Sequence, residues 1–303
     1  MPLPRPQAPA MPELPDVTLY VDALRGRVVG RVVSELAIRN TFVLRSVAVP
    51  PSAWTGRTIS GVSRFGKRIV LHGADDHHLV IHLMIAGRLR WLAPGKKPLG
   101  KLALALLAFE HGTLVLTEAG SKRRASLHLV QGRDALAEFV RGGLEPLEVG
   151  LEAFAERLRS ENHTIKRSLT DPSMFSGIGN AYSDEILHRA RLGPLVWTTR
   201  LTDEEIARLH RAMREVLIEW TDRLRDELVD GWPAKVTAFH AAMAVHGRYG
   251  KPCPVCDTLV QRIRYAENET NYCARCQTGG RLLADRALSR LLRDDWPRSI
   301  DEW

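Results

Sequence analysis

Four cysteines occur in the 303-residue sequence, and they form two Cys-x-x-Cys pairs near the carboxyl end. Cys253 and Cys256 make the first pair, Cys273 and Cys276 make the second, and sixteen residues lie between the two pairs. This spacing is typical of four thiolates that form a tetrahedron around one Zn²⁺ ion. Such a site leaves no coordination position open, so the metal would be structural. Two disulfides are the alternative, but the first ten residues lack the pattern of a signal peptide.

A second group of chemically useful residues is the stretch Gly177-Ile178-Gly179-Asn180. It precedes a segment with helix-start signals, with Asn180 as a candidate cap and Asp184 and Glu185 in the expected first turn. Gly193-Pro194 is expected to end this helix. Small residues before a helix let a phosphate approach the backbone N–H groups at its start. A tight connection without a ligand is the alternative interpretation.

The third group is MPELPDV, from Met11 to Val17, which follows the ten residues MPLPRPQAPA. Pro15 at the first helical position and Asp16 near the positive end of the helix dipole predict a helix from Asp16 to about Val29. A second Met-Pro pair inside the chain is unusual, and its meaning depends on the chemistry expected of Pro12.

The elements that would position these residues fall into two kinds. Up to Val130 the sequence alternates in short apolar runs separated by glycine and aspartate, which predicts a β-sandwich or barrel. The eight-residue run at Leu102–Phe109 is expected to be a buried strand. From Leu151 onward the pattern is helical, with a long amphipathic stretch at Thr202–Leu228. Between the cysteine pairs the sequence alternates as a hairpin, in which Gln261, Arg262 and Arg264 are available to phosphate.

Composition narrows the class of partner. The net charge is +8 and the isoelectric point is about 9.6. Because lysine and arginine release counterions when they neutralise phosphates, this balance favours a polyanion such as DNA or RNA. The longest nearly unbroken apolar run has eight residues, far fewer than the roughly 20 that a membrane-spanning helix needs. We therefore expect no membrane association and a cytoplasmic location.

Several motifs occur in one order along the chain, and together they resemble the formamidopyrimidine-DNA glycosylase/endonuclease VIII (Fpg/Nei) family. These are MPELPDV, FGKRIVL, IHLMIAGRLRW, IKRSLTD with SGIGNAYSDEIL, and the four-cysteine segment. The resemblance covers about residues 11 to 280. It implies an α+β multidomain fold with an N-terminal β-sandwich flanked by helices, an all-α helix-two-turn-helix domain and a C-terminal β-hairpin zinc finger.

The corresponding boundaries are an extension at 1–10, a catalytic domain at 11–145, a DNA-binding domain at 150–235, a zinc finger at 245–280 and a tail at 281–303. The partner implied is damaged double-stranded DNA, whose lesion nucleotide is turned out of the stack. We expect a monomer, bacterial in type and associated with the nucleoid through DNA.

The resemblance assigns Pro12 the role of nucleophile and Glu13 that of acid/base carboxylate. A free N-terminal proline is a secondary amine, so its attack on the sugar leaves a persistently charged iminium that promotes strand cleavage. Inside a chain, however, the proline nitrogen is a tertiary amide and cannot attack. We therefore expect translation to begin at Met11, or residues 1–10 to be removed, with methionine trimming then exposing Pro12. A less favoured variant makes Pro2 the nucleophile, although no carboxylate neighbours it.

Further residues match positions that contact DNA in the family. Lys67 matches a hairpin lysine that contacts phosphate and assists proton transfer. Lys166 and Asn180 match residues that hold the phosphates flanking the lesion, and Glu185 matches an acidic residue of the same helix. The remaining candidates for DNA contact are Lys122, Arg123 and Arg264. Each of these cations has a simpler alternative as a solvated surface residue.

The sequence departs from the family pattern at the positions that fill the gap left by the extruded base. Ile85 stands at the expected methionine, with Met84 beside it, and Lys122-Arg123-Arg124 replaces an Arg-Arg-Phe run. Asn268 occupies the position of a finger arginine, which puts the second elimination in doubt. The segment Trp232–Gly247 is short for the loop that caps oxidised purines, which favours oxidised pyrimidines or abasic sites.

Three functions remain open from the sequence. The first is a bifunctional glycosylase and abasic-site lyase acting on oxidised bases. The second is a catalytically silent protein of the same fold that binds damaged DNA or abasic sites. The third is an RNA-associated zinc protein, for which the basic charge and the finger would suffice.

Overall fold

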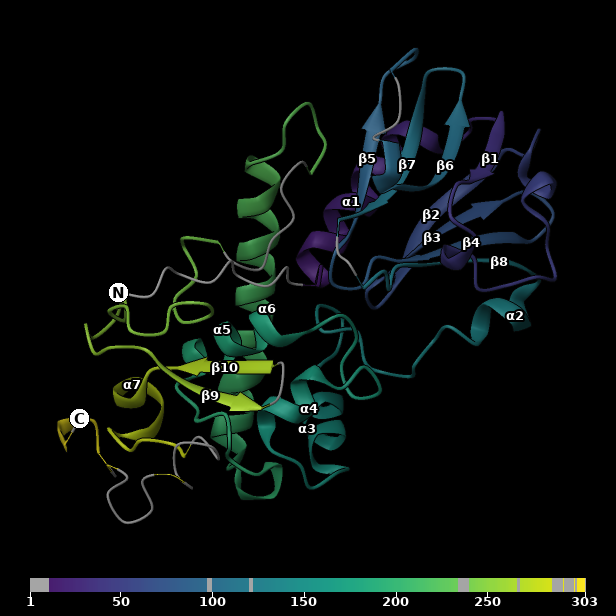
Figure 1. Ribbon diagram of the computed structural model, residues 1–303. Coiled ribbons are helices and arrows are strands. Elements are labelled where there is room, and N and C mark those ends of the chain that lie inside the picture. The colour runs from purple at the N-terminus through teal and green to yellow at the C-terminus, as the bar shows by residue number, and fades with distance from the viewer. Residues whose placement is uncertain are drawn as a thin grey trace. The chain divides into compact units, whose positions relative to one another are not determined.

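The computed structural model describes residues 11–96, 100–119, 122–233, 240–265, 268–284, 291, 297 and 299–302 (Figure 1). The chain divides into two compact units. The first contains residues up to 141 together with 221–237, and the second contains 142–220 together with 238–303. Each unit has its own secondary structure and its own core.

The first unit is a β-sandwich. One antiparallel sheet has the order β1-β6-β7-β5, and its strands span Glu35–Ile38, Ala103–Phe109, Gly112–Glu118 and Gly87–Leu92. The other has the order β2-β3-β4-β8, with strands at Ile59–Phe65, Arg68–Gly73, His77–His82 and Ser126–Gln131. The predicted sandwich and the buried strand near 102–109 are therefore confirmed.

One apolar cluster joins the two sheets. It combines inward residues of one sheet, such as Leu107 and Leu116, with residues of the other, such as Leu71 and Leu129. Each of these side chains is at most 3% exposed. Because alternate residues of a strand face opposite sides, this shared core explains the alternating sequence pattern.

Helix α1, Leu14–Val28, packs into the same core through Val17, Tyr20 and Leu24. It begins two residues earlier than predicted, so Pro15 occupies its second position and Asp16 its third. The Asp16 carboxylate accepts the Glu13 N–H at 2.9 Å, which caps the helix start. The unit also contains the short helix α2, Arg133–Ala137, and the 3-10 turns η1 to η3 at Thr41–Val43, Pro51–Trp54 and Gly100–Leu102.

The second unit contains the predicted helices and the hairpin. Its helices α3, α4 and α5 span Leu151–Arg159, Ile165–Thr170 and Asn180–Ala190, and it contains most of α6, Asp203–Asp226, whose last residues from Thr221 onward belong to the first unit. Strands β9, Gln261–Tyr265, and β10, Asn268–Tyr272, pair antiparallel as expected. The short helix α7, Ala274–Thr278, follows them, and the 3-10 turns η4 and η6 lie at Thr198–Arg200 and Ile300–Glu302.

The ends of α5 differ from the sequence-based expectation. Gly179 is the cap residue and Asn180 the first helical residue, so Asp184 and Glu185 lie in the second turn. The helix ends through Arg191, which adopts a left-handed conformation with φ of 54°. Gly193 has a different role, because a Cβ there would lie 3.0 Å from Thr278 Cγ2. The glycine thus allows α7 to pack closely against the segment after α5.

Within the described part of the chain, no helix is both long enough and apolar enough to span a membrane. The segment Trp232–Gly247 corresponds to the loop that is expected to cap oxidised purines in other family members. Residues 234–239 of this segment lie outside the described residues. The extension at 1–10, most of the tail and the side chain of Asn268 also lie outside them.

Candidate functional site

Pro12 and Glu13 lie immediately before α1, where the chain enters the core of the first unit. Both residues are buried, and Glu13 is 3% exposed. The Glu13 backbone is fixed on both sides, because its N–H donates to Asp16 and its carbonyl accepts the Val17 N–H at 2.9 Å. The helix start therefore holds the expected nucleophile and its neighbouring carboxylate in one fixed backbone conformation.

Asp16 is a further carboxyl group at this helix start. It is 2% exposed, and burial raises its pKa to about 7, although the Glu13 N–H and the positive charge of Arg88 oppose this shift. The negative charge of Glu13 adds to the increase. Two carboxyl groups therefore lie close together beside Pro12, and the protonation of one depends on the other.

The expected gap-filling residues, Met84 and Ile85, lie in the tight turn between β4 and β5. Met84 has a φ of 52°, which is rare for a residue with a side chain. Two sets of contacts stabilise the turn. The Gly87 N–H donates to the Leu83 carbonyl at 2.9 Å, and Arg88 donates to the carbonyls of Ile85 and Gly87 at 3.0 and 2.7 Å. The turn thus presents Met84 and Ile85 on a rigid backbone.

Lys67 lies in the turn between β2 and β3, at the edge of a positively charged group. Its neighbour Arg68 is paired with His82 across β3 and β4. Burial, together with the charges of Arg68, Lys67 and His128, lowers the pKa of His82 to about 4. His82 is therefore neutral at pH 7. The positively charged group is suited to an anion such as a DNA phosphate.

The predicted DNA-contact residues Lys122 and Arg123 are exposed in the loop between β7 and β8. Arg123 donates to the Lys101 carbonyl at 3.2 Å. The far end of the loop is fixed by Glu118, which is 1% exposed and accepts the N–H groups of Arg124 and Ala125 at 2.9 and 3.1 Å. The two cations therefore lie on a loop whose far end is fixed.

In the second unit the structure brings Lys166 and Asn180 together. The Lys166 ammonium donates to the Asn180 carbonyl at 2.7 Å and lies 2.5 Å from Asp184 Oδ1. The Lys166 side chain is 12% exposed and that of Asp184 is fully buried. Asn180 in turn donates its side-chain amide to the Glu269 carbonyl of β10 at 2.7 Å. Lys166 and Asn180 are therefore in direct contact at the start of α5.

Asp184 and Glu185 connect α5 to the finger segment. Asp184 Oδ2 accepts His246 Nδ1–H at 2.8 Å and the Asn271 N–H at 3.1 Å. Glu185 accepts the three consecutive backbone N–H groups of residues 244 to 246 at 2.7 to 2.9 Å. Burial raises the pKa of Glu185, while these three N–H groups oppose the increase. The acidic pair is therefore a structural link, and neither carboxylate is a solvent-exposed acid.

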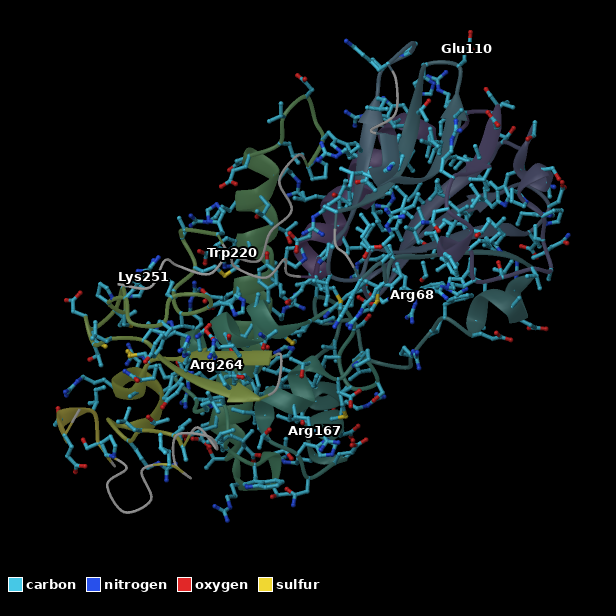
Figure 2. All side chains as sticks on the ribbon, viewed as in Figure 1. Arg68, Glu110, Arg167, Trp220, Lys251 and Arg264 are labelled. Carbon is cyan, nitrogen blue, oxygen red and sulfur yellow. The ribbon has the colours of Figure 1, made fainter. Side chains whose placement is uncertain are left out.

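Arg264 lies on β9 of the finger hairpin, where Figure 2 labels it. Its side chain is 58% exposed and lies 3.6 Å from Glu269 Oε2. Arg262, two residues earlier, lies 3.4 Å from the same carboxylate oxygen and stacks over the Tyr249 ring at 4.0 Å. Arg264 is thus the more accessible of the two arginines for a phosphate contact.

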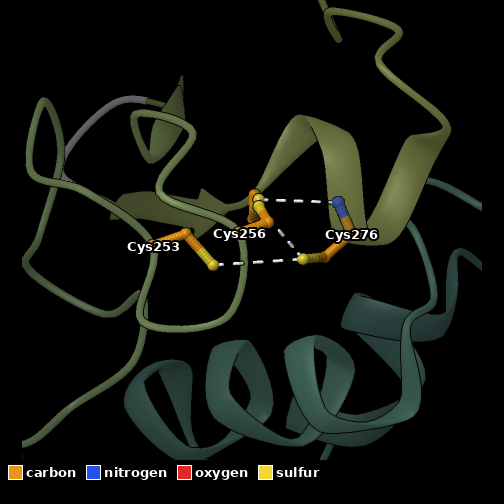
Figure 3. A group of neighbouring side chains, drawn as sticks. Cys253, Cys256 and Cys276 are labelled. Atoms are coloured by element: carbon orange, nitrogen blue, oxygen red, sulfur yellow. Dashed lines mark hydrogen bonds between the residues drawn. The ribbon is translucent and has the colours of Figure 1, made fainter.

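The four cysteines gather at one point, as Figure 3 shows for three of them. Their Sγ atoms all lie within 4.8 Å of one another, and none forms a disulfide. The distances are 4.0 Å for Cys253–Cys276 and 3.4 Å for both Cys256–Cys273 and Cys256–Cys276. A tetrahedral Zn²⁺ with bonds of ~2.3 Å needs sulfur atoms about 3.8 Å apart. The thiolates therefore fit one structural zinc ion, as predicted.

Some functionally placed residues were missed by sequence analysis. Glu118 was not singled out, and Asp184 was interpreted only as a helix-start signal. His188 of α5 lies 3.3 Å from Cys253 Sγ, which no local pattern indicates because 65 residues separate the two. One sequence signal could have indicated these contacts, namely the many charged and polar residues in NAYSDEILHR. Most of this helix is buried, so these side chains bind other parts of the protein and not solvent.

Three family models match consecutive parts of the chain. They are described as the formamidopyrimidine-DNA glycosylase N-terminal domain, matching residues 11–126, the formamidopyrimidine-DNA glycosylase H2TH domain, matching 143–223, and the zinc finger found in FPG and IleRS, matching 250–279. Their order is the order of the sandwich, the helical segment and the cysteine hairpin.

Similar curated proteins carry the same name. The chain is 34% identical over 281 residues to the formamidopyrimidine-DNA glycosylase of Heliobacterium modesticaldum, with 88% of this chain and 100% of that protein covered. For the protein of that name from Thermus thermophilus, identity is 35% over 284 residues, and the match covers 89% and 100%. The chain therefore belongs to the formamidopyrimidine-DNA glycosylase family.

Solved structures give the same result. Lactococcus lactis Fpg in complex with DNA that contains an abasic site is 26% identical, with a TM-score of 0.77 over 88% of this chain and 99% of that one. The complex of the same protein with oxidised-pyrimidine DNA has a TM-score of 0.78 and 26% identity, and covers 88% and 100%. The fold predicted from the sequence motifs is thus confirmed.

Proposed function

We propose that this protein is a base-excision repair DNA glycosylase that removes oxidised bases from duplex DNA. Family membership supports this function. The structural observation that supports it most is the position of Pro12 and Glu13 at the start of α1, beside the carboxyl group of Asp16. The RNA-associated alternative has no comparable support, because the family models match the whole of residues 11–126, far beyond the finger.

We further propose that base removal proceeds through Pro12 and is followed by abasic-site lyase activity. The Pro12 nitrogen forms a bond to the anomeric carbon of the deoxyribose, and the bond from that carbon to the base breaks. The nitrogen loses its proton and forms a second bond to this carbon, which breaks the bond to the ring oxygen and opens the sugar. Glu13 supplies a proton to the sugar oxygen or to the leaving base. The resulting iminium takes up the electron pair released when the neighbouring carbon loses a proton, and the 3′ phosphate then leaves.

This role requires Pro12 to be the first residue of the active protein. With Met11 attached, its nitrogen is a tertiary amide without an available electron pair. The first family match begins at Met11, which agrees with a mature chain that starts at Pro12. Protein that keeps residues 1–11 would bind damaged DNA without cleaving it. It would then behave as the catalytically silent DNA-binding protein of the alternative hypothesis, here called the silent binder.

Each unit offers cations that we propose contact the DNA. Lys166 and Asn180 present one surface at the start of α5, and Arg264 is exposed on the finger hairpin. Lys67 lies in a positively charged group of the sandwich, and Lys122 and Arg123 lie on the loop that Glu118 fixes. Contacts of this kind fix the position of a duplex without reading its sequence.

For substrate, we propose oxidised pyrimidines and abasic sites ahead of oxidised purines, because Trp232–Gly247 is short for a purine-capping loop. We also propose that the protein acts as a monomer in the cytoplasm, where it associates with chromosomal DNA.

The test is base release by protein that begins at Pro12. Duplexes containing an oxidised pyrimidine, 8-oxoguanine or no lesion are incubated with it, and released bases are measured by mass spectrometry. We expect release from the pyrimidine lesion to be fastest and Glu13→Gln to reduce it strongly. Release from no duplex, together with tight binding to all damaged ones, would favour the silent binder.

A further inference from the structure

Helix α5 contacts the zinc site through a histidine near its carboxyl end. His188 Nε2 lies 3.3 Å from Cys253 Sγ, and the two residues are 7% and 0% exposed. The histidine belongs to the helical segment, whereas the cysteine opens the finger, so the contact joins parts of the chain that are far apart in sequence.

The direction of this hydrogen bond follows from the chemistry of the sulfur. A zinc-bound cysteine is a thiolate, which has no proton to donate. The imidazole must therefore carry its proton on Nε2 and donate it to the sulfur. We propose that His188 is a hydrogen-bond donor to the Cys253 thiolate and that this bond makes zinc retention depend on helix α5.

Other contacts place His188 within a continuous seam between α5 and the finger. Asp184, one turn earlier on the same face, accepts the Asn271 N–H of β10. After the helix, the Leu192 carbonyl accepts Gln277 Nε2–H at 2.9 Å, and Gln277 Oε1 accepts the Cys273 N–H at 2.8 Å. Within the described residues, His188 is the member of this seam that contacts a sulfur ligand from outside the finger.

The seam connects two ends of one helix. Asn180, at the start of α5, belongs to the proposed phosphate-binding surface, and His188 lies two turns later beside the zinc site. Because a helix is rigid over this length, loss of the His188 contact would loosen the finger from the element that carries Asn180. The inference is independent of the proposed base-excision activity, since it concerns metal retention and holds whichever lesion is removed.

The experiment compares three variants of the full zinc-loaded chain. His188→Phe keeps a flat ring but removes the donor, and His188→Gln can place an N–H close to the position of Nε2. His210→Phe is the matched control, because His210 Nε2 bonds to the Val149 carbonyl at 2.9 Å within the same unit. Zinc affinity is measured by competition with a chromophoric chelator, and the thiolate-to-metal charge-transfer band is recorded after Co²⁺ substitution.

We expect His188→Phe to lower zinc affinity by about 10- to 100-fold, as is usual when a partner of a metal ligand is removed. The Co²⁺ charge-transfer band should move to lower energy, because a thiolate without its donor is more electron-rich. His188→Gln should restore most of both values, and His210→Phe should change neither. Parental affinity and an unmoved band in His188→Phe would overturn the proposal, as would equal losses in the Phe and Gln variants. If His188→Phe fails to fold, the position of the band in His188→Gln decides, because a bonded thiolate keeps the parental energy.

Discussion

Replacing Asp184 with asparagine should destabilise the second unit more than an acid-to-amide substitution at an exposed position does. The carboxylate is fully buried against the Lys166 ammonium and accepts two further N–H groups, from His246 and Asn271. Removing one partner of a buried ion pair costs about 3–5 kcal/mol. Because Lys166 retains 12% exposure and water can reach it, we expect a value near the lower end, about 3 kcal/mol.

The asparagine variant also has only one acceptor oxygen for three donors. At least one N–H would therefore lose its partner, at a further cost of about 1–3 kcal/mol. A chain with two units need not unfold in one step, so the free energy of opening is measured by native-state hydrogen exchange of peptides from α5. Glu219→Gln is the control, because its ion pair with Arg189 is more than 40% exposed on both sides and should contribute under ~1 kcal/mol.

A double-mutant cycle isolates the interaction between the charges. Lys166→Met removes the ammonium that Asp184→Asn leaves without a counterion, so the double variant should lose less than the sum of the two single losses. A difference of about 1–3 kcal/mol is expected for groups in direct contact. Additive losses, or a cost below about 1 kcal/mol for Asp184→Asn, would show that the buried pair does not hold α4 to α5.

The remaining predictions concern pH, packing, DNA and metal. Because burial raises the pKa of Asp16 to about 7, folding takes up a proton between about pH 4 and 7, and stability falls as pH rises through that range. This decrease in the free energy of unfolding is at most ~1.4 kcal/mol per pH unit, and Asp16→Asn should abolish it when stability is measured by urea unfolding. Gly87→Ala should destabilise the sandwich by about 1–3 kcal/mol in thermal unfolding, because its Cβ would lie 2.2 Å from the Leu83 carbonyl oxygen. Asn180→Ala should weaken binding to damaged and undamaged duplexes alike in fluorescence anisotropy, and equal affinity of variant and parent would contradict its role. Removal of zinc by a chelator should make residues 250–279 sensitive to limited proteolysis and weaken DNA binding, and unchanged resistance would contradict a structural metal.

Local signals were sufficient to predict much of this fold from the sequence. Cysteine spacing determines a metal site almost alone, and the alternation of apolar residues identified the strands because each sheet has one face in a shared core. The start of α1 was misplaced by two residues because Pro15 is tolerated at more than the first position of a helix. For α5, the sequence favoured Asn180 as the cap residue. The cap is Gly179, which has an extended backbone, and Asn180 is the first helical residue.

The contacts between distant segments were not predictable from the sequence. Asp184 and Glu185 resemble the acidic residues of a solvated first turn, yet both are buried and bind the backbone and side chains of the finger segment. His188 gave no signal, because its partner Cys253 is distant in the chain. Such pairs are determined by tertiary packing, which neither periodicity nor composition records. The roles of Pro12 and Glu13 came from family resemblance and stay predictions.

The most direct test of the central claim is to locate the covalent bond between protein and DNA. Protein beginning at Pro12 is incubated with an abasic duplex and borohydride, digested, and analysed by mass spectrometry. We predict a reduced adduct on the Pro12 nitrogen, and none when residues 1–11 remain attached. An adduct on a lysine such as Lys67, or equal trapping by the longer chain, would contradict catalysis by Pro12.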